Sequence, residues 1–111
     1  MLNTRTVMAG LIVALFSVAA GAAEVTVMQN SKSFKKDGAK IDKLEIKVGD
    51  TVKFKNEDPF FHNIFSLSEL KTFDLGSYPA GESKSVKFDS PGMAEVECAI
   101  HPDMYLEVTV K

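Results

Sequence analysis

Apolar and polar residues alternate with a period of two along seven short segments of the chain. These segments cover residues 24–28, 43–48, 51–55, 62–66, 85–88, 94–97 and 106–111. A period of two predicts β-strands with one buried and one wet face, because successive side chains of a strand point to opposite sides. No segment has a clear helical period. The least regular stretch is 67–80, where we expect a single helical turn at Ser68–Lys71.

Turn-forming residues separate these segments. They are Asp37-Gly38, Gly49-Asp50, Glu57-Asp58-Pro59, Pro79-Ala80-Gly81 and Ser90-Pro91-Gly92. Short strands at this spacing are typical of a β-sandwich or a β-barrel. The chain has 111 residues, which is the length of one domain. The pattern therefore predicts a single all-β domain.

The pattern of residues 1–23 predicts a secretory signal peptide. Arg5 is its only charged residue, an apolar run follows from Val7 to Ala20, and Gly21-Ala22-Ala23 supplies the small residues needed for cleavage. The apolar run is shorter than the roughly 20 residues that span a bilayer, which argues against a membrane anchor. We expect cleavage after Ala23, with sites one or two residues away as competitors. A domain at 24–111 would then be exported, to the periplasm, free of the membrane.

Without the signal peptide the chain is mildly acidic. It has 12 lysines against 15 aspartates and glutamates, a net charge of −3. Nucleic-acid binding needs a basic patch, and nothing in the sequence indicates one. A domain of 88 residues buries a modest share of its surface, so a bound metal is one way to stabilise it.

The chain contains only two histidines and one cysteine, and all three fall where a metal site would need them. Cys98, His101 and Met104 form a C-x2-H-x2-M run, and His62 lies upstream. Two imidazoles, a thiolate and a thioether are the ligand set of an electron-transfer copper centre. Taken alone, each histidine is more often a core residue. The alternatives for Cys98 are an inert buried thiol or an intermolecular disulfide.

Strand parity places three of these four side chains on the core side. His62, Cys98 and Met104 each share the parity of the apolar residues in their own strand. His101 lies in the five-residue loop between Cys98 and Met104. All four can therefore meet at one end of a sandwich, with His101 at the rim.

In these residues the chain resembles the cupredoxins, the small blue-copper proteins. Its short ligand loop is similar to that of amicyanin, whereas plastocyanin and azurin have longer loops. The matching positions are Val48-Gly49-Asp50-Thr51-Val52, Asn56, His62-Asn63, Cys98, His101, Pro102 and Met104. The resemblance implies a Greek-key β-sandwich of seven or eight strands and one copper ion that cycles between Cu(II) and Cu(I), with His62, Cys98, His101 and Met104 as ligands. It also implies that Asn63 ties the ligand loops together and that a backbone donor near it binds the thiolate.

The resemblance implies an electron carrier and not an enzyme. Partner proteins would dock on an apolar surface around His101, flanked by Pro59, Phe60, Phe61, Ile100 and Pro102. At most one of the two phenylalanines is expected on that surface, since Phe61 has the parity opposite to His62. We expect a monomer that exchanges single electrons with redox proteins such as a cytochrome c, a dehydrogenase or an oxidase.

The main alternative function is copper handling, as a tolerance protein, a chaperone or a sensor on the same fold. Only three methionines follow the signal peptide, fewer than a site for labile copper usually carries. A nucleophile triad of Cys98, a histidine and Asp103, or zinc at the cysteine and both histidines, is disfavoured, since zinc would leave the methionine without a role. The negative charge of Asp103 is expected to favour Cu(II) and to lower the reduction potential.

Overall fold

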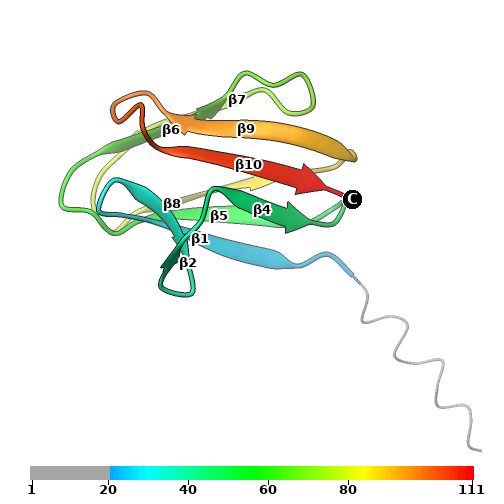
Figure 1. The fold of residues 1–111 in the computed structure, drawn as a ribbon, viewed down its shortest axis with the longest axis horizontal. Helices are drawn as coiled ribbons and strands as arrows, with labels where there is room; N and C mark the ends of the chain where they lie inside the picture. The colour runs from blue at the N-terminus through cyan, green and yellow to red at the C-terminus, as the bar shows by residue number, and fades with distance from the viewer. Residues whose placement is uncertain (1–20) are drawn as a thin grey trace, which may run out of the picture.

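Two β-sheets packed face to face form the domain (Figure 1). The computed structural model describes residues 21–111, so the predicted signal peptide lies almost wholly outside the described residues. One sheet has the strand order β3-β2-β1-β5-β8 and the other β4-β10-β9-β6-β7. The strands are β1 (Glu24–Asn30), β2 (Ser33–Lys36), β3 (Ala39–Lys40), β4 (Lys43–Ile46), β5 (Thr51–Asn56), β6 (His62–Ser66), β7 (Phe73–Tyr78), β8 (Ser83–Lys87), β9 (Gly92–Cys98) and β10 (Tyr105–Val110). The predicted Greek-key β-sandwich is confirmed.

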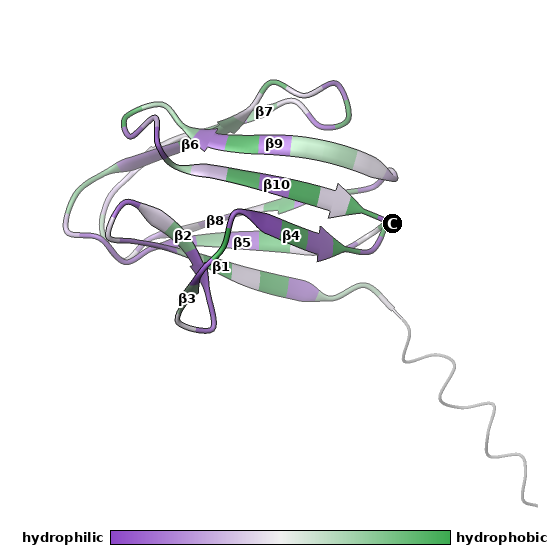
Figure 2. Cartoon of the chain, in the orientation of Figure 1, coloured by the Kyte–Doolittle hydropathy of each residue, from purple (hydrophilic) through white to green (hydrophobic). Residues whose placement is uncertain are grey.

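All seven segments with a period of two are strands, namely β1, β4, β5, β6, β8, β9 and β10. Their alternation appears as bands of green and purple along the arrows in Figure 2. Along β9 from Ala94 onward, and along β10, the even-numbered residues are buried. Val48 is an exception to the predicted pattern, since it follows the end of β4 and is 45% exposed.

Strand β7 lies within residues 67–80, where the sequence shows no regular period. Its pairing with β6 shifts by one residue between Asn63↔Ser77 and Phe65↔Asp74, so β7 carries a β-bulge. Gly76, in the bulge, has a φ of 72°, a backbone conformation that glycine adopts without strain. Because an extra residue reverses the parity of a strand, the period of two is lost, which is why the pattern failed to predict β7.

The helical turn expected at Ser68–Lys71 is absent from the described residues. An isolated turn takes its place, in which the N–H of Lys71 donates to the carbonyl of Ser68 at 3.2 Å. Among the residues described, no helix is long and apolar enough to cross a membrane.

Gln29 and Tyr78 form a polar pair in the core between the sheets. Gln29 Nε2 donates to the Tyr78 hydroxyl at 2.7 Å, and that hydroxyl donates to Gln29 Oε1 at 2.9 Å. Both side chains are fully buried. Burial raises the pKa of Tyr78, so the phenol stays neutral and keeps both bonds.

Tyr78→Phe is expected to lower the free energy of unfolding by about 1–3 kcal/mol, because the buried Gln29 amide loses its partner. Tyr105→Phe is the matched control. The Tyr105 hydroxyl donates to Glu95 on the exposed face, and its loss is expected to change stability by less than about 0.5 kcal/mol. Urea unfolding of both variants measures the difference. Equal losses would show that the buried pair contributes no more than an exposed bond.

Candidate metal centre

The four candidate ligands converge at one end of the sandwich. His62 begins β6, Cys98 ends β9, and His101 and Met104 lie on the segment that leads into β10. Strands β6 and β9 are neighbours, with Ile64 paired to Cys98. In Figure 1 the loop between β9 and β10 is at the left end, opposite the C-terminus. The structure therefore brings together residues that lie up to 42 positions apart in the sequence.

Three donor atoms face a common point. Cys98 Sγ lies 3.6 Å from His62 Nδ1 and 3.7 Å from His101 Nδ1, and the two nitrogens are 3.2 Å apart. A triangle with these sides has its centre about 2.0 Å from each corner, and metal–imidazole and metal–thiolate bonds are about 2.0–2.3 Å long. The donor set and its spacing therefore fit one metal ion.

Burial separates the two histidines. His62 is fully buried, as parity predicted, whereas His101 is only partly buried and lies at the rim, as its place in the short loop predicted. The Phe60 ring packs against both imidazoles, with centroid distances of 5.5 Å to His62 and 5.1 Å to His101. Partial burial and the nearby His62 lower the pKa of His101, which favours the neutral imidazole that a metal binds.

Met104 is buried beneath the ligand loop. It is 1% exposed, and its N–H donates to the carbonyl of His101 at 2.9 Å. This bond holds the backbone of the loop in a tight turn between the two residues. The inward orientation agrees with the parity argument, and the role of the sulfur as a ligand stays a prediction.

Asn63 connects strand β6, which carries His62, to the loop that follows Cys98. Its N–H donates to Cys98 Sγ at 3.4 Å, and its carbonyl accepts from the N–H of Ala99 at 2.9 Å. The side-chain amide reaches Ser77 Oγ on β7 at 3.5 Å. A hydrogen bond to the sulfur stabilises a thiolate and is one way in which surrounding residues tune a metal.

Asp58 belongs to the site, although the sequence indicated only a turn there. Its Oδ2 lies 2.7 Å from His62 Nε2, on the side of the ring that faces away from Cys98. The carboxylate also accepts the N–H groups of Ser31 at 2.6 Å and Lys32 at 3.0 Å. Burial raises the pKa of Asp58, but the hydrogen bonds from Lys32, His62 and Ser31 outweigh it and hold the pKa below its usual value.

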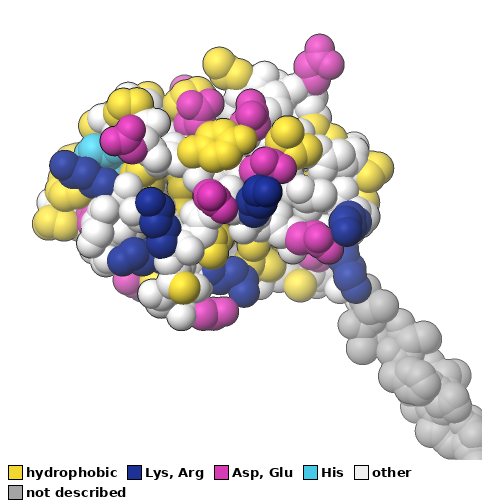
Figure 3. Space-filling view, in the orientation of Figure 1, with side chains coloured by type: hydrophobic (Ala, Val, Ile, Leu, Met, Phe, Trp, Pro, Cys, Tyr) yellow, Lys and Arg dark blue, Asp and Glu magenta, His cyan; other side chains and the backbone are white. Residues whose placement is uncertain are grey.

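The surface around His101 is partly apolar. Ile100 is 48% exposed, Phe61 is 53% exposed, and Pro102 is exposed as well. In Figure 3 histidine is visible at this end of the molecule, beside lysine side chains. Of the two phenylalanines, Phe60 packs against the two histidines and Phe61 is exposed.

Comparisons with known proteins point to a family of copper-binding proteins. The sequence model of a family described as copper-binding proteins of the plastocyanin/azurin family matches residues 21–111. A search of curated protein sequences finds no match.

Similar solved structures include a methionine-to-alanine variant of amicyanin in the Cu(I) form, with a TM-score of 0.70, 21% identity and coverage of 79% of this chain and 82% of amicyanin. A reduced tryptophan-to-tyrosine variant of amicyanin gives a TM-score of 0.69, 24% identity and coverage of 86% and 88%. A copper-containing nitrite reductase from Thermus scotoductus SA-01 gives a TM-score of 0.69 and 30% identity. The match covers 79% of this chain but only 22% of the reductase. Together with the donor geometry, the family match shows that the chain belongs to the plastocyanin/azurin family of copper-binding proteins and that its cofactor is one copper ion.

Proposed function

We propose that this protein is an electron carrier whose copper ion is held by His62, Cys98, His101 and Met104. The observation that carries the proposal is the triangle of one sulfur and two imidazole nitrogens, whose centre lies at bonding distance from all three. Bound copper supplies a one-electron couple, and this mixed set of soft and imidazole donors suits both of its oxidation states.

The sandwich holds these side chains in place. His62 and Cys98 are buried and lie on neighbouring strands, and the N–H of Asn63 is directed at the sulfur. Side chains packed in a dense core change position little. A ligand set that stays fixed when the charge of the ion changes keeps the reorganisation energy of electron transfer small.

The exposed edge of His101 is the proposed route for electrons. It lies beside the exposed residues Ile100 and Pro102, which give an apolar surface that a partner protein can cover. We propose that redox proteins dock here one at a time and that the protein acts as a monomer and not as an enzyme. The predicted signal peptide supports a place in the periplasm.

Voltammetry of the copper-loaded protein tests this function, with zinc-loaded protein as the redox-silent control. We expect a reversible one-electron wave, and fast electron self-exchange between oxidised and reduced protein measured by NMR line broadening. Loss of copper on each reduction, or binding of Cu(I) alone, would instead favour the copper-handling alternative. Slow self-exchange would contradict a fixed ligand set.

A further inference from the structure

We propose that Asp58 is a positioning residue that orients His62 and shifts the copper couple toward Cu(II). The proposal rests on the proposed ligation of copper by His62. The two nitrogens of His62 face different groups: Nδ1 faces Cys98 and His101, and Nε2 faces Asp58 at 2.7 Å. An ionised carboxylate can only accept hydrogen bonds, so Nε2 carries the proton and Nδ1 keeps its lone pair for the metal.

Asp58 is itself held from three sides. Ser31 and Lys32, in the turn between β1 and β2, have φ values of 56° and 58°, and both direct their N–H groups at the carboxylate. The N–H of Asp58 donates to Asn56 Oδ1 at 2.8 Å, and Asn56 Nδ2 donates to the carbonyl of Phe60 at 2.8 Å. The bonds fix the whole loop before His62, so the carboxylate cannot turn away from the imidazole.

The charge of Asp58 reaches the metal through one imidazole ring. The residue is 4% exposed, so water screens this charge weakly. A carboxylate behind a histidine ligand raises the basicity of the ligand. A negative charge at this position also favours Cu(II) over Cu(I), because the oxidised ion carries the larger positive charge. The positive charge of Lys32 Nζ, which lies over the Phe60 ring at 5.6 Å from its centroid, only partly offsets this effect.

Asp58→Asn removes the charge and keeps the size of the side chain, and Asp103→Asn removes an equal charge at an exposed position. In Asp58→Asn we expect a ten- to hundredfold loss of Cu(II) affinity, larger than the loss of Cu(I) affinity, as is typical for partners of ligand histidines. Each tenfold change in the affinity ratio raises the potential by about 59 mV. Asp103→Asn is expected to give a smaller rise. Equal potentials in the wild type and Asp58→Asn, or equal rises in the two variants, would overturn the proposal.

A second readout uses the metal-free wild-type protein, so it needs no copper and does not depend on the folding of a variant. Nitrogen-15 NMR of the metal-free wild type reports which ring nitrogen of His62 carries the proton at neutral pH. We expect a proton on Nε2, which faces Asp58, and an unprotonated Nε2 would overturn the role of Asp58. This readout stays valid if the protein proves not to carry electrons, so the two proposals fail separately.

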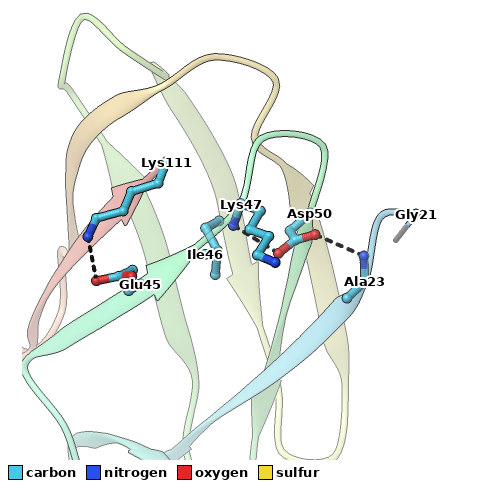
Figure 4. Close-up of a pocket in the computed structure, with 7 residues that line it drawn as sticks. All are labelled: Gly21, Ala23, Glu45, Ile46, Lys47, Asp50 and Lys111. Carbon is cyan, nitrogen blue, oxygen red and sulfur yellow. Dashed lines mark hydrogen bonds and ion pairs between the residues drawn. The ribbon is translucent and has the colours of Figure 1, made fainter. Parts of the chain in front are cut away.

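We infer independently that the mature chain begins at Ala23 and not at Glu24. At the end of the molecule opposite the copper site, the N–H of Ala23 donates to Asp50 Oδ1 at 2.9 Å (Figure 4). The carbonyl of Ala23 accepts the N–H of Thr51 at 2.9 Å, which extends the pairing of β1 with β5. Cleavage after Ala23 would remove both bonds and leave the Asp50 oxygen without this donor.

Cleavage after Ala22 would instead strengthen the first bond. Hydrolysis of the Ala22–Ala23 peptide consumes one water and leaves a carboxylate on Ala22 and an α-ammonium on Ala23. That ammonium would lie beside the Asp50 carboxylate, which also accepts the N–H of Lys47 at 3.0 Å. The residues before the bond, Ala20-Gly21-Ala22, have the A-x-A pattern of a cleavage site.

The intact mass of the exported protein tests this boundary. We expect a chain of 89 residues, since 22 of the 111 are removed, and a mass lower by one alanine would overturn the inference.

Domains released from a fusion with Ala23 or Glu24 as first residue provide the stability comparison. The hydrogen bonds from Ala23 and Lys47 lower the pKa of Asp50. The stabilisation by the ion pair between the Ala23 ammonium and Asp50 is therefore fully present above the pKa of Asp50 in the unfolded chain, about 3.9. It is lost as the pH falls through the lower pKa of Asp50 in the folded protein. Glu45, Lys47 and Lys111 line the pocket beside Asp50, and all three residues are present in both forms. The Ala23 form is expected to be the more stable at pH 7, with the difference disappearing in acid; equal stability at pH 7 would contradict a role for the ion pair.

Discussion

Replacing Cys98 with serine is expected to abolish the strong visible absorption of the Cu(II)-loaded protein. That absorption requires charge transfer from a thiolate to copper, and a serine hydroxyl does not ionise at neutral pH. The affinity for Cu(I) should also fall, because a soft thiolate is the ligand that Cu(I) prefers. Absorption spectroscopy during Cu(II) addition measures the first effect, and competition with a Cu(I) chelator measures the second.

The fold is expected to survive this substitution. The N–H of Asn63, which donates to Cys98 Sγ, can donate to a serine oxygen instead, so the new hydroxyl is not left without a partner. Ser66→Ala is the matched control, because Ser66 is also fully buried and lies at the far end of the same strand as His62. It should keep the band. A band that persists in Cys98→Ser would show that the sulfur is not a copper ligand.

Leu106→Ala is expected to lower the free energy of unfolding of the metal-free domain by about 2–5 kcal/mol. Leu106 is fully buried on β10, two residues after Met104, and its removal leaves a cavity between the sheets. A domain of this kind has only about 5–15 kcal/mol of stability in total. The loss is therefore large enough to populate unfolded protein at moderate temperature, which urea unfolding of the metal-free protein measures.

Leu67→Ala is the same substitution on the surface. Leu67 is 77% exposed, so its truncation should change the stability by less than about 0.5 kcal/mol. A similar loss in both variants would mean that the packing between the sheets is not the main source of stability. Because neither leucine belongs to the candidate metal centre, the two variants test the stability of the fold without changing a candidate copper ligand.

The sandwich and the burial of three candidate ligands could be predicted from residue parity. His62, Cys98 and Met104 share the parity of the apolar residues in their strands, and parity alone is enough to place a side chain in the core. His101 could be placed at the rim because five loop residues leave it no strand to join. Local rules were sufficient here because each candidate ligand lies within or next to a regular strand.

Other features could not be predicted because they depend on contacts between distant parts of the chain. The bulge at Gly76 reverses the parity of β7, and nothing in the sequence alone marks the position where this happens. Asp58 lies in a loop with no period, and its role depends on the turn at Ser31 and Lys32 folding over it. Strand β2 has one apolar residue, Phe34, among its four, and β3 has only two residues, so neither shows a period of two.

Stoichiometric addition of Cu(II) to the metal-free mature protein, followed by visible absorption and electron paramagnetic resonance, tests the central claim most directly. We predict an intense thiolate-to-copper band that saturates at one equivalent, disappears on one-electron reduction and returns in full on reoxidation. A protein that stays colourless with Cu(II), or a band that does not return after one redox cycle, would contradict the account.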